Sequence, residues 1–369
     1  MLNPEFEIQL IAVLLAMACA VPGVFLVLRR MSMVTDAITH TILLGIVIGF
    51  FIVKDLNSPV LILGATIIGV MTVWVSELLS DTRLMVEESA IGIVYPLFFS
   101  IAVILISRYA GSAHLDTDSV LLGELAFAPF NRYTVNGVDI GAKGLYTSGF
   151  LLLLNLIFVG VFFKELKLVI FDPALATIIG FSPAIIHYAL MSVVSVTIVG
   201  SFEAVGSVLV IAFMIGPPAT AYLLTNDLKR MILYSMAIGS FSGIIGFRLA
   251  MLLDVSIPGS MAVVVGFVFM LAVLFAPKRG LVSTLLLRAK QRKTYHQLAL
   301  LWHVYQHEHT DRANVENHIS TISKHLNWEQ SKIDRIVASL VQDGKLQVRD
   351  GMLYNMLDAS ELEAFLFDE

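Results

Sequence analysis

Two side chains that can ligate a metal stand one helical turn apart in an otherwise apolar stretch, MVTDAITHTILLGIVIGF, residues 33–50. Asp36 and His40 are four positions apart, so on a helix they share one face. An aspartate at the centre of a membrane span costs at least ~2.5 kcal/mol, so the pair should face protein or an aqueous path. Its oxygen and nitrogen suit a divalent first-row metal such as Zn, Mn or Fe. The spacing also permits a helix cap at Asp36 and a packed polar residue at His40.

A second candidate, Glu203, lies in GSFEAVGS, residues 200–207, between two apolar runs. A glycine-rich break beside an acidic residue is typical of a discontinuous transmembrane helix, which is tolerated only where it is buried in protein or lines a cavity. Glu203 is therefore a candidate gate or ion-contacting residue in the outer half of the membrane. An ordinary surface loop is the alternative. His187, early in the preceding run, is expected to be a packed helix-end residue.

A third group, near the C-terminus, contains His303, His307 and His309 in the stretch WHVYQHEHTD. His303 and His307 are four positions apart and can ligate a metal from one helix face, as in a zinc-binding helix. We treat the three histidines as a candidate cytoplasmic metal site. The spacing identifies no further ligand, so a purely structural role stays open.

The composition indicates a polytopic membrane protein, because 57% of the 369 residues are hydrophobic and only 14% are charged, where a soluble protein carries about a quarter charged residues. One cysteine excludes an internal disulfide. The first apolar run lacks a preceding basic region, so we expect a retained span and not a removed signal peptide. We predict an all-α fold of about nine spans, with eight to ten as the range, near residues 6–28, 37–53, 59–79, 90–107, 146–164, 184–201, 204–224, 231–252 and 258–276.

The distribution of lysine and arginine predicts the orientation. Clusters at residues 29–30, 83, 164–167, 229–230 and 278–279 fall on one side if the N-terminus is outside. The chain is then a multi-pass protein of the bacterial cytoplasmic membrane, with its C-terminus in the cytoplasm. The two arginines also place Asp36 nearer the cytoplasmic half, and we expect the first two spans to meet in a broken, pore-lining region.

A short helix is predicted between the fifth and sixth spans, in FDPALATIIGFSP, residues 171–183. Asp172 is the expected N-cap, Pro173 the first helical residue, and Gly180 the end. A helix of about two turns is not stable alone in water, so it should lean on this protein's own surface or on a partner.

The composition changes after the last span, which predicts two domains: a transmembrane domain, 1–285, and a small cytoplasmic α+β domain, 286–369. Helices near 292–307, 315–325 and 329–342, then strands KLQVR and MLYNM turning at Asp350-Gly351, follow the order of a winged helix. Residues 291–369 carry eight basic against twelve acidic side chains. Because nucleic-acid binding needs a basic surface, we expect protein contact or regulation instead.

Three stretches, in this order, resemble the permease subunits of ABC importers for manganese, zinc or iron: residues 29–50, 171–181 and EAVGSVLVIAFMIGPPATA, 203–221. The resemblance covers about residues 5–280. It implies a fold similar to that of the cobalamin and siderophore permeases. It also implies a metal path at Asp36, His40 and Glu203, and an ATPase-coupling helix with Asp172, Pro173, Leu175, Ile179 and Gly180. The C-terminal domain resembles a segment appended to some members and similar to metal-responsive repressors.

The chain contains no G-x-x-x-x-G-K-[ST] phosphate loop, so we expect no enzyme activity here and ATP hydrolysis in a separate cytoplasmic subunit. The resemblance further implies an extracytoplasmic solute-binding protein and a second permease copy, identical or paralogous. A two-fold axis would bring two Asp36–His40 pairs, up to four ligands, to one transported ion. No permanently bound cofactor is expected.

Two other classes of function fit part of the sequence. The first is an ATP-independent secondary transporter or channel with a regulatory domain, in which Asp36, His40 and Glu203 relay ions. The second is a membrane-anchored regulator whose C-terminal domain is the working part. It leaves the spans and the intramembrane Asp36–His40 pair without a purpose.

Overall fold

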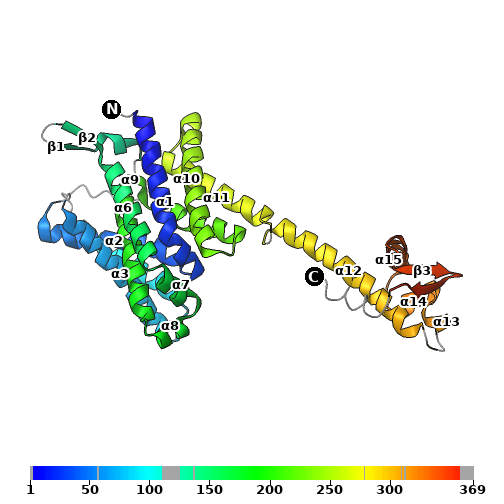
Figure 1. Ribbon diagram of the computed structural model, residues 1–369. Coiled ribbons are helices and arrows are strands. Elements are labelled where there is room, and N and C mark those ends of the chain that lie inside the picture. The colour runs from blue at the N-terminus through cyan, green and yellow to red at the C-terminus, as the bar shows by residue number, and fades with distance from the viewer. Residues whose placement is uncertain are drawn as a thin grey trace. The chain divides into compact units, whose positions relative to one another are not determined.

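The computed structural model describes residues 3–55, 58–109, 125–135, 138–277, 279–308, 310 and 313–357. The chain divides into two compact units, Met1–Gly280 and Leu281–Glu369 (Figure 1). Within these described ranges, nine helical segments are long and apolar enough to cross a membrane. The predicted membrane fold of about nine apolar helices is therefore confirmed.

The N-terminal unit contains all of these spans. Its elements are α1 (Pro4–Leu28), α2 (Ser32–Val53), α3 (Pro59–Asp81), α4 (Glu87–Tyr109), the 3-10 helix η1 (Leu125–Phe130), β1 (Arg132–Val135), β2 (Val138–Ala142), α6 (Lys143–Val161), α7 (Phe163–Phe171), α8 (Pro173–Ile179), α9 (Pro183–Leu224), α10 (Leu228–Leu253) and α11 (Ile257–Phe275). Several helices begin with a side-chain cap. The Ser58 hydroxyl accepts a hydrogen bond from the Val60 amide, and Asp227 accepts one from Arg230. Such caps satisfy amide groups that have no partner within the helix.

The core of this unit surrounds α1, which packs against α6, α9 and α10 (Figure 1). Ile11, Leu15 and Phe25 are completely or almost completely buried. Helix α2 packs instead on α3 and α4 and touches α1 only slightly. The expectation that the first two spans meet in a broken region is wrong: both are uninterrupted helices, and Arg30, with φ 62°, lies in the short turn between them.

Helix α9 contains the predicted break, at Gly206, where φ is 73° and ψ is 171°. A φ in this range favours glycine because it has no Cβ atom. Before the break, α9 runs antiparallel to α1: Ser201 lies 3.8 Å from Cys19, whereas His187 contacts Arg29.

After the break, the second half of α9 runs in the direction opposite to the first half. Gly239 of α10 faces both Ala16 of α1 and Pro217 in the second half of α9. The directions of these two segments can therefore each be compared with the direction of α10. One turn further along α10, Gly243 faces Ala12 and Phe213. Both α1 and the second half of α9 are therefore antiparallel to α10. The chain reverses at Gly206, and the two halves of α9 are two separate spans.

The C-terminal unit consists of α12 (Leu281–His307), α13 (Ala313–Glu316), α14 (Ile319–His325), α15 (Gln330–Gln342), β3 (Leu346–Arg349) and β4 (Met352–Asn355). It has its own apolar core, in which Leu300, Ile333 and Leu340 are fully buried. The hairpin β3–β4 turns at Asp350 and Gly351, whose φ angles of 50° and 79° are those of a type I′ turn.

The helices of this unit differ from the prediction at two points. Helix α12 begins at Leu281 and not near residue 292. The helix expected over 315–325 is divided into α13 and α14, because the backbone at Asn317 and His318 pairs with β4. The Leu353 amide donates to the Asn317 carbonyl at 3.0 Å, and His318 forms a bridge to Met352. The winged-helix class itself stays a prediction.

Candidate metal path and its supporting contacts

The sequence-predicted pair lies together near the start of α2. The Asp36 Oδ1 and His40 Nε2 atoms are 3.5 Å apart, and the two side chains are 41% and 30% exposed. The His40 ring stacks against Tyr95 of α4 at a centroid distance of 5.7 Å and meets Phe99 edge-on. Two aromatic rings therefore hold the imidazole in place, while the pair stays open on one side.

The pair offers two donor atoms of the kinds that Zn, Mn and Fe accept. Such ions take at least four ligands, so one copy of α2 supplies an incomplete site. Water or a second protein chain must complete it.

Helix α2 is held against α3 by a very close approach and a buried hydroxyl pair. A Cβ atom on Gly45 would lie 2.3 Å from the Gly64 carbonyl oxygen. Near the site, the Thr72 hydroxyl donates to the Thr41 hydroxyl at 2.9 Å. Small residues and interhelical hydrogen bonds are the main means of helix association in lipid.

A partly buried polar network joins the ends of α1, α3 and α9. Arg29 Nη1 lies 2.5 Å from His187 Nδ1, and His187 Nε2 lies 2.5 Å from a Glu77 oxygen. Since arginine only donates, His187 Nδ1 is the acceptor of the Arg29 contact. Tyr188 donates to the other Glu77 oxygen at 2.7 Å. Burial lowers the pKa of Arg29, against the raising effect of Glu77 and Glu87.

Sequence reasoning placed His187 as a packed helix-end residue but did not find its partners. His187 and Arg29 are 158 positions apart. No local spacing could have connected them.

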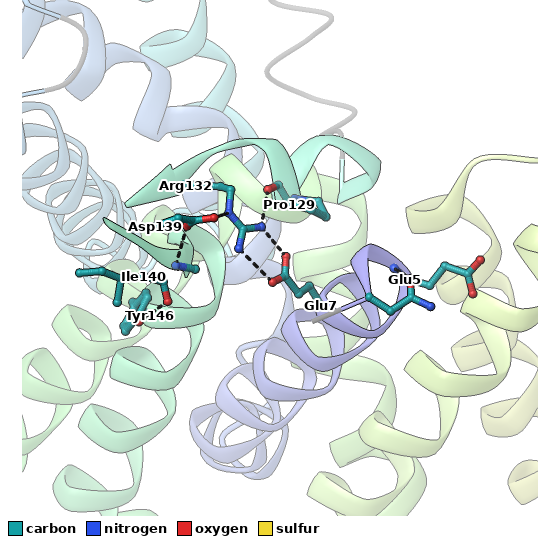
Figure 2. A network of polar contacts seen from close by, with 9 residues as sticks. Glu5, Glu7, Pro129, Arg132, Asp139, Ile140 and Tyr146 are labelled. Carbon is teal, nitrogen blue, oxygen red and sulfur yellow. Dashed lines mark hydrogen bonds and ion pairs between the residues drawn. The ribbon is translucent and has the colours of Figure 1, made fainter. Parts of the chain in front are cut away.

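The opposite end of α1 carries an ion-pair network (Figure 2). Arg132 Nη1 and Nη2 lie 3.0 and 3.3 Å from the two oxygens of Glu7, which is only 3% exposed. Arg132 also donates to Asp139 through Nε at 2.5 Å and to the Pro129 carbonyl at 3.1 Å. Hydrogen bonding to Glu7 raises the pKa of Arg132. These contacts attach the β1–β2 hairpin to α1.

Helix α8 has the ends that the sequence predicted. The Asp172 side chain accepts from the Leu175 amide at 2.9 Å, Pro173 is the first residue, and Gly180 has φ 100°. Only Ala176 is buried in this helix. Leu175 and Ile179 are 41% and 58% exposed, so an apolar face is left uncovered by the part of the chain described here.

Two predicted residues cannot be placed. Glu203 belongs to α9, but its side chain lies outside the described part of the structure. His309 lies outside the described residues altogether.

His303 and His307 do come together, with ring centroids 4.7 Å apart. Glu316, which sequence reasoning missed, joins them, with its Oε2 atom 2.9 Å from His307 Nε2. Burial lowers the pKa of His303 below 6.5, so its imidazole is neutral near pH 7.

Multiple apolar spans around a partly exposed carboxylate–imidazole pair are the features of a polytopic membrane transport protein. The chain belongs to the ABC 3 transport family, which matches residues 6–276. The resemblance predicted from the three sequence stretches is thereby confirmed.

Two relatives are each 42% identical to this chain. One is the zinc transport system membrane protein TroD of Treponema pallidum (strain Nichols), aligned over 347 residues, 94% of each chain. The other is the manganese transport system membrane protein MntD of Bacillus subtilis (strain 168), aligned over 281 residues, 76% of this chain and 95% of the relative. An alignment over 94% of this chain must include most of the C-terminal unit.

A solved structure has a similar fold. It is PsaBC from Streptococcus pneumoniae in complex with Fab, with a TM-score of 0.62 and 26% sequence identity. The match covers 74% of this chain and 92% of that chain. The fold over that part of this chain therefore has a solved counterpart.

Proposed function

We propose that this protein is the permease subunit of an ATP-driven importer for divalent transition-metal ions, Mn, Zn or Fe. The observation that carries the proposal is the Asp36–His40 pair, two metal-ligating side chains 3.5 Å apart inside an apolar span. The relatives named for zinc and manganese transport support a metal as the cargo.

The working pore is a dimer in this proposal. One chain contributes two ligands and leaves them partly exposed. A second copy, identical or paralogous, would bring the number to four, which suits a tetrahedral or distorted site. Glu203 belongs to the segment where α9 reverses. It is the proposed second polar residue of the metal path, nearer the outer side of the membrane.

The energy comes from a separate cytoplasmic ATPase, and α8 is the proposed docking helix. Its exposed Leu175 and Ile179 give an apolar surface that an ATPase groove can bury. The N-terminus is outside and the C-terminal unit is in the cytoplasm of a bacterium. A solute-binding protein delivers the ion from outside.

The test is uptake of radiolabelled Mn²⁺ and Zn²⁺ by proteoliposomes that contain the complete set of subunits. We expect Asp36→Ala and His40→Ala each to lower uptake at least about tenfold, because each removes a ligand. Thr66→Ala is the matched control, since Thr66 is an exposed polar residue of a span whose hydroxyl, among the described residues, donates within its own helix to the Ile62 carbonyl. Unchanged uptake in both path variants would overturn the proposal.

The same preparation separates the proposal from an ATP-independent transporter or channel. Uptake should stop when the ATPase subunit carries a substitution that abolishes hydrolysis. Uptake that continues without hydrolysis would favour the channel.

A further inference from the structure

Three metal-ligating side chains converge in the C-terminal unit, away from the Asp36–His40 pair in sequence and in a different unit. His303, His307 and Glu316 each offer one ligand atom, and these atoms all lie within 4.8 Å of one another. All three side chains are partly buried. One ion placed among them can reach all three.

The cluster is built by two helices and bordered by a third. His303 and His307 are one turn apart on α12, and Glu316 is the last residue of α13. His303 Nε2 also lies 3.3 Å from the Glu316 backbone oxygen. His325 of α14 lies at the edge, its ring centroid 6.0 Å from that of His303.

The neighbouring residue holds α13 in position. Asn317 is buried, and its side-chain amide donates to the Val304 carbonyl of α12 at 3.0 Å. Val304 follows His303 directly, so this bond fixes Glu316 opposite the two histidines. The Asn317 bond thus preorganises the cluster without using any of the three ligand atoms, as a binding site requires.

Two imidazole nitrogens and one carboxylate oxygen form a ligand set that Zn²⁺ prefers. Structural zinc sites are closed by four protein ligands, whereas a site with three keeps a position for water. A three-ligand, partly exposed site therefore exchanges its ion with the surrounding solution. This property suits detection of the ion more than permanent support of the fold.

We propose that His303, His307 and Glu316 form a second divalent-metal site, of the zinc-binding class, through which the C-terminal unit senses the metal on its side of the membrane. Only residues 276–280 separate α11, the last span, from α12, which carries the two histidines. A bound ion thus acts on a helix joined directly to the transport unit. The existence of this metal site does not depend on the proposed transport function, whereas its regulatory role rests on that function.

The binding experiment uses the full-length chain purified in detergent, with Asp36→Ala and His40→Ala present so that the path pair is removed. Zn²⁺ is titrated calorimetrically, and bound metal is counted after gel filtration. We expect one Zn²⁺ per chain. Adding His303→Gln with His307→Gln should weaken binding by at least about 100-fold, and Glu316→Gln should weaken it by at least about tenfold.

The matched control is His296→Gln, which removes another imidazole of α12 that lies against Trp328 and outside the cluster. It should bind Zn²⁺ as the background chain does. Elution as a single symmetric peak establishes that each variant is folded. Equal binding by the folded double-glutamine variant and its background would overturn the site.

The regulatory experiment uses proteoliposomes of the complete transporter, with Zn²⁺ or a chelator on the face that receives ATP. Wild-type uptake should differ several-fold between the two conditions, and uptake by His303→Gln with His307→Gln should not. An equal response of both proteins would overturn the sensing role. Absence of any wild-type uptake would contradict the proposed function instead, while the zinc titration would still decide the site.

Discussion

Gly45 of α2 and Gly64 of α3 face each other across a contact so close that neither position has room for a Cβ atom. A Cβ on Gly45 would lie 2.3 Å from the Gly64 carbonyl oxygen, and one on Gly64 would lie 2.6 Å from that of Gly45. The obstacle on each side is backbone, which cannot move aside alone. This contact sets the distance between α3 and the helix that carries Asp36 and His40.

Gly45→Ala should therefore destabilise the membrane unit. The added methyl group forces α2 and α3 apart, and overpacking of this kind costs about 1–3 kcal/mol. Gly266→Ala is the control, because, apart from its own helix backbone and chain neighbours, no atom of the described residues lies within 4 Å of its Cβ position. Thermal unfolding in detergent, followed by fluorescence-detected gel filtration, should show a lower midpoint for Gly45→Ala alone. Equal midpoints would show that the helices do not meet at Gly45.

Removal of Arg132 should release the β1–β2 hairpin from α1. In Arg132→Gln the nearly buried Glu7 carboxylate loses both of its bonds to the guanidinium, and a buried charge without a partner is strongly unfavourable. Hydrogen exchange of the β2 amides should become faster. Adding Glu7→Gln should restore part of the protection, because the uncompensated charge is then gone. No gain in the double variant would contradict the role of Glu7.

Changes at the exposed face of α8 should uncouple transport without unfolding the protein. Leu175 is 41% exposed and makes its capping bond through its backbone amide, so Leu175→Glu changes the surface and keeps the helix. We expect loss of metal uptake and of ATPase co-purification. Leu175→Met, which preserves an apolar surface, is the control. Wild-type uptake by Leu175→Glu would contradict the docking role.

The C-terminal unit should become less stable as the pH falls. Burial, then the positive charges of Lys332 and Arg292, lower the pKa of His296 below its ordinary value of 6.5. In the folded unit Lys332 Nζ lies 2.7 Å from His296 Nε2, which requires a neutral imidazole that accepts. His296 binds a proton near pH 6.5 in the unfolded chain and only at lower pH in the folded chain. Its contribution to the free energy of unfolding is therefore complete above pH 6.5 and is lost as the pH falls from there to the folded-state pKa.

Hydrogen exchange of α15 amides at pH 7.5 and pH 5.5, corrected for intrinsic rates, measures this effect. Protection should decrease at the lower pH. His296→Gln should reduce the decrease, and a remainder should persist because burial also lowers the pKa of His303. An unchanged pH dependence in His296→Gln would assign the effect to other groups.

Several features of this protein are readable from neighbouring residues alone. The spans follow from apolar runs of sufficient length, and α8 follows from Asp172, Pro173 and Gly180, because capping depends on dihedral angles and hydrogen bonds within one turn. The closeness of Asp36 and His40 is likewise a consequence of the helical repeat. The β3–β4 turn at Asp350-Gly351 is a further case, since both residues tolerate positive φ.

The tertiary structure decided everything that depends on which helices meet. It brought Arg132 to Glu7, His187 to Arg29, and Glu316 to His307, pairs whose members belong to different elements. It also directed α2 onto α3 and α4. Long-range packing depends on the fit of whole helix surfaces, such as the Gly45–Gly64 contact, and the local pattern of a sequence does not contain that fit.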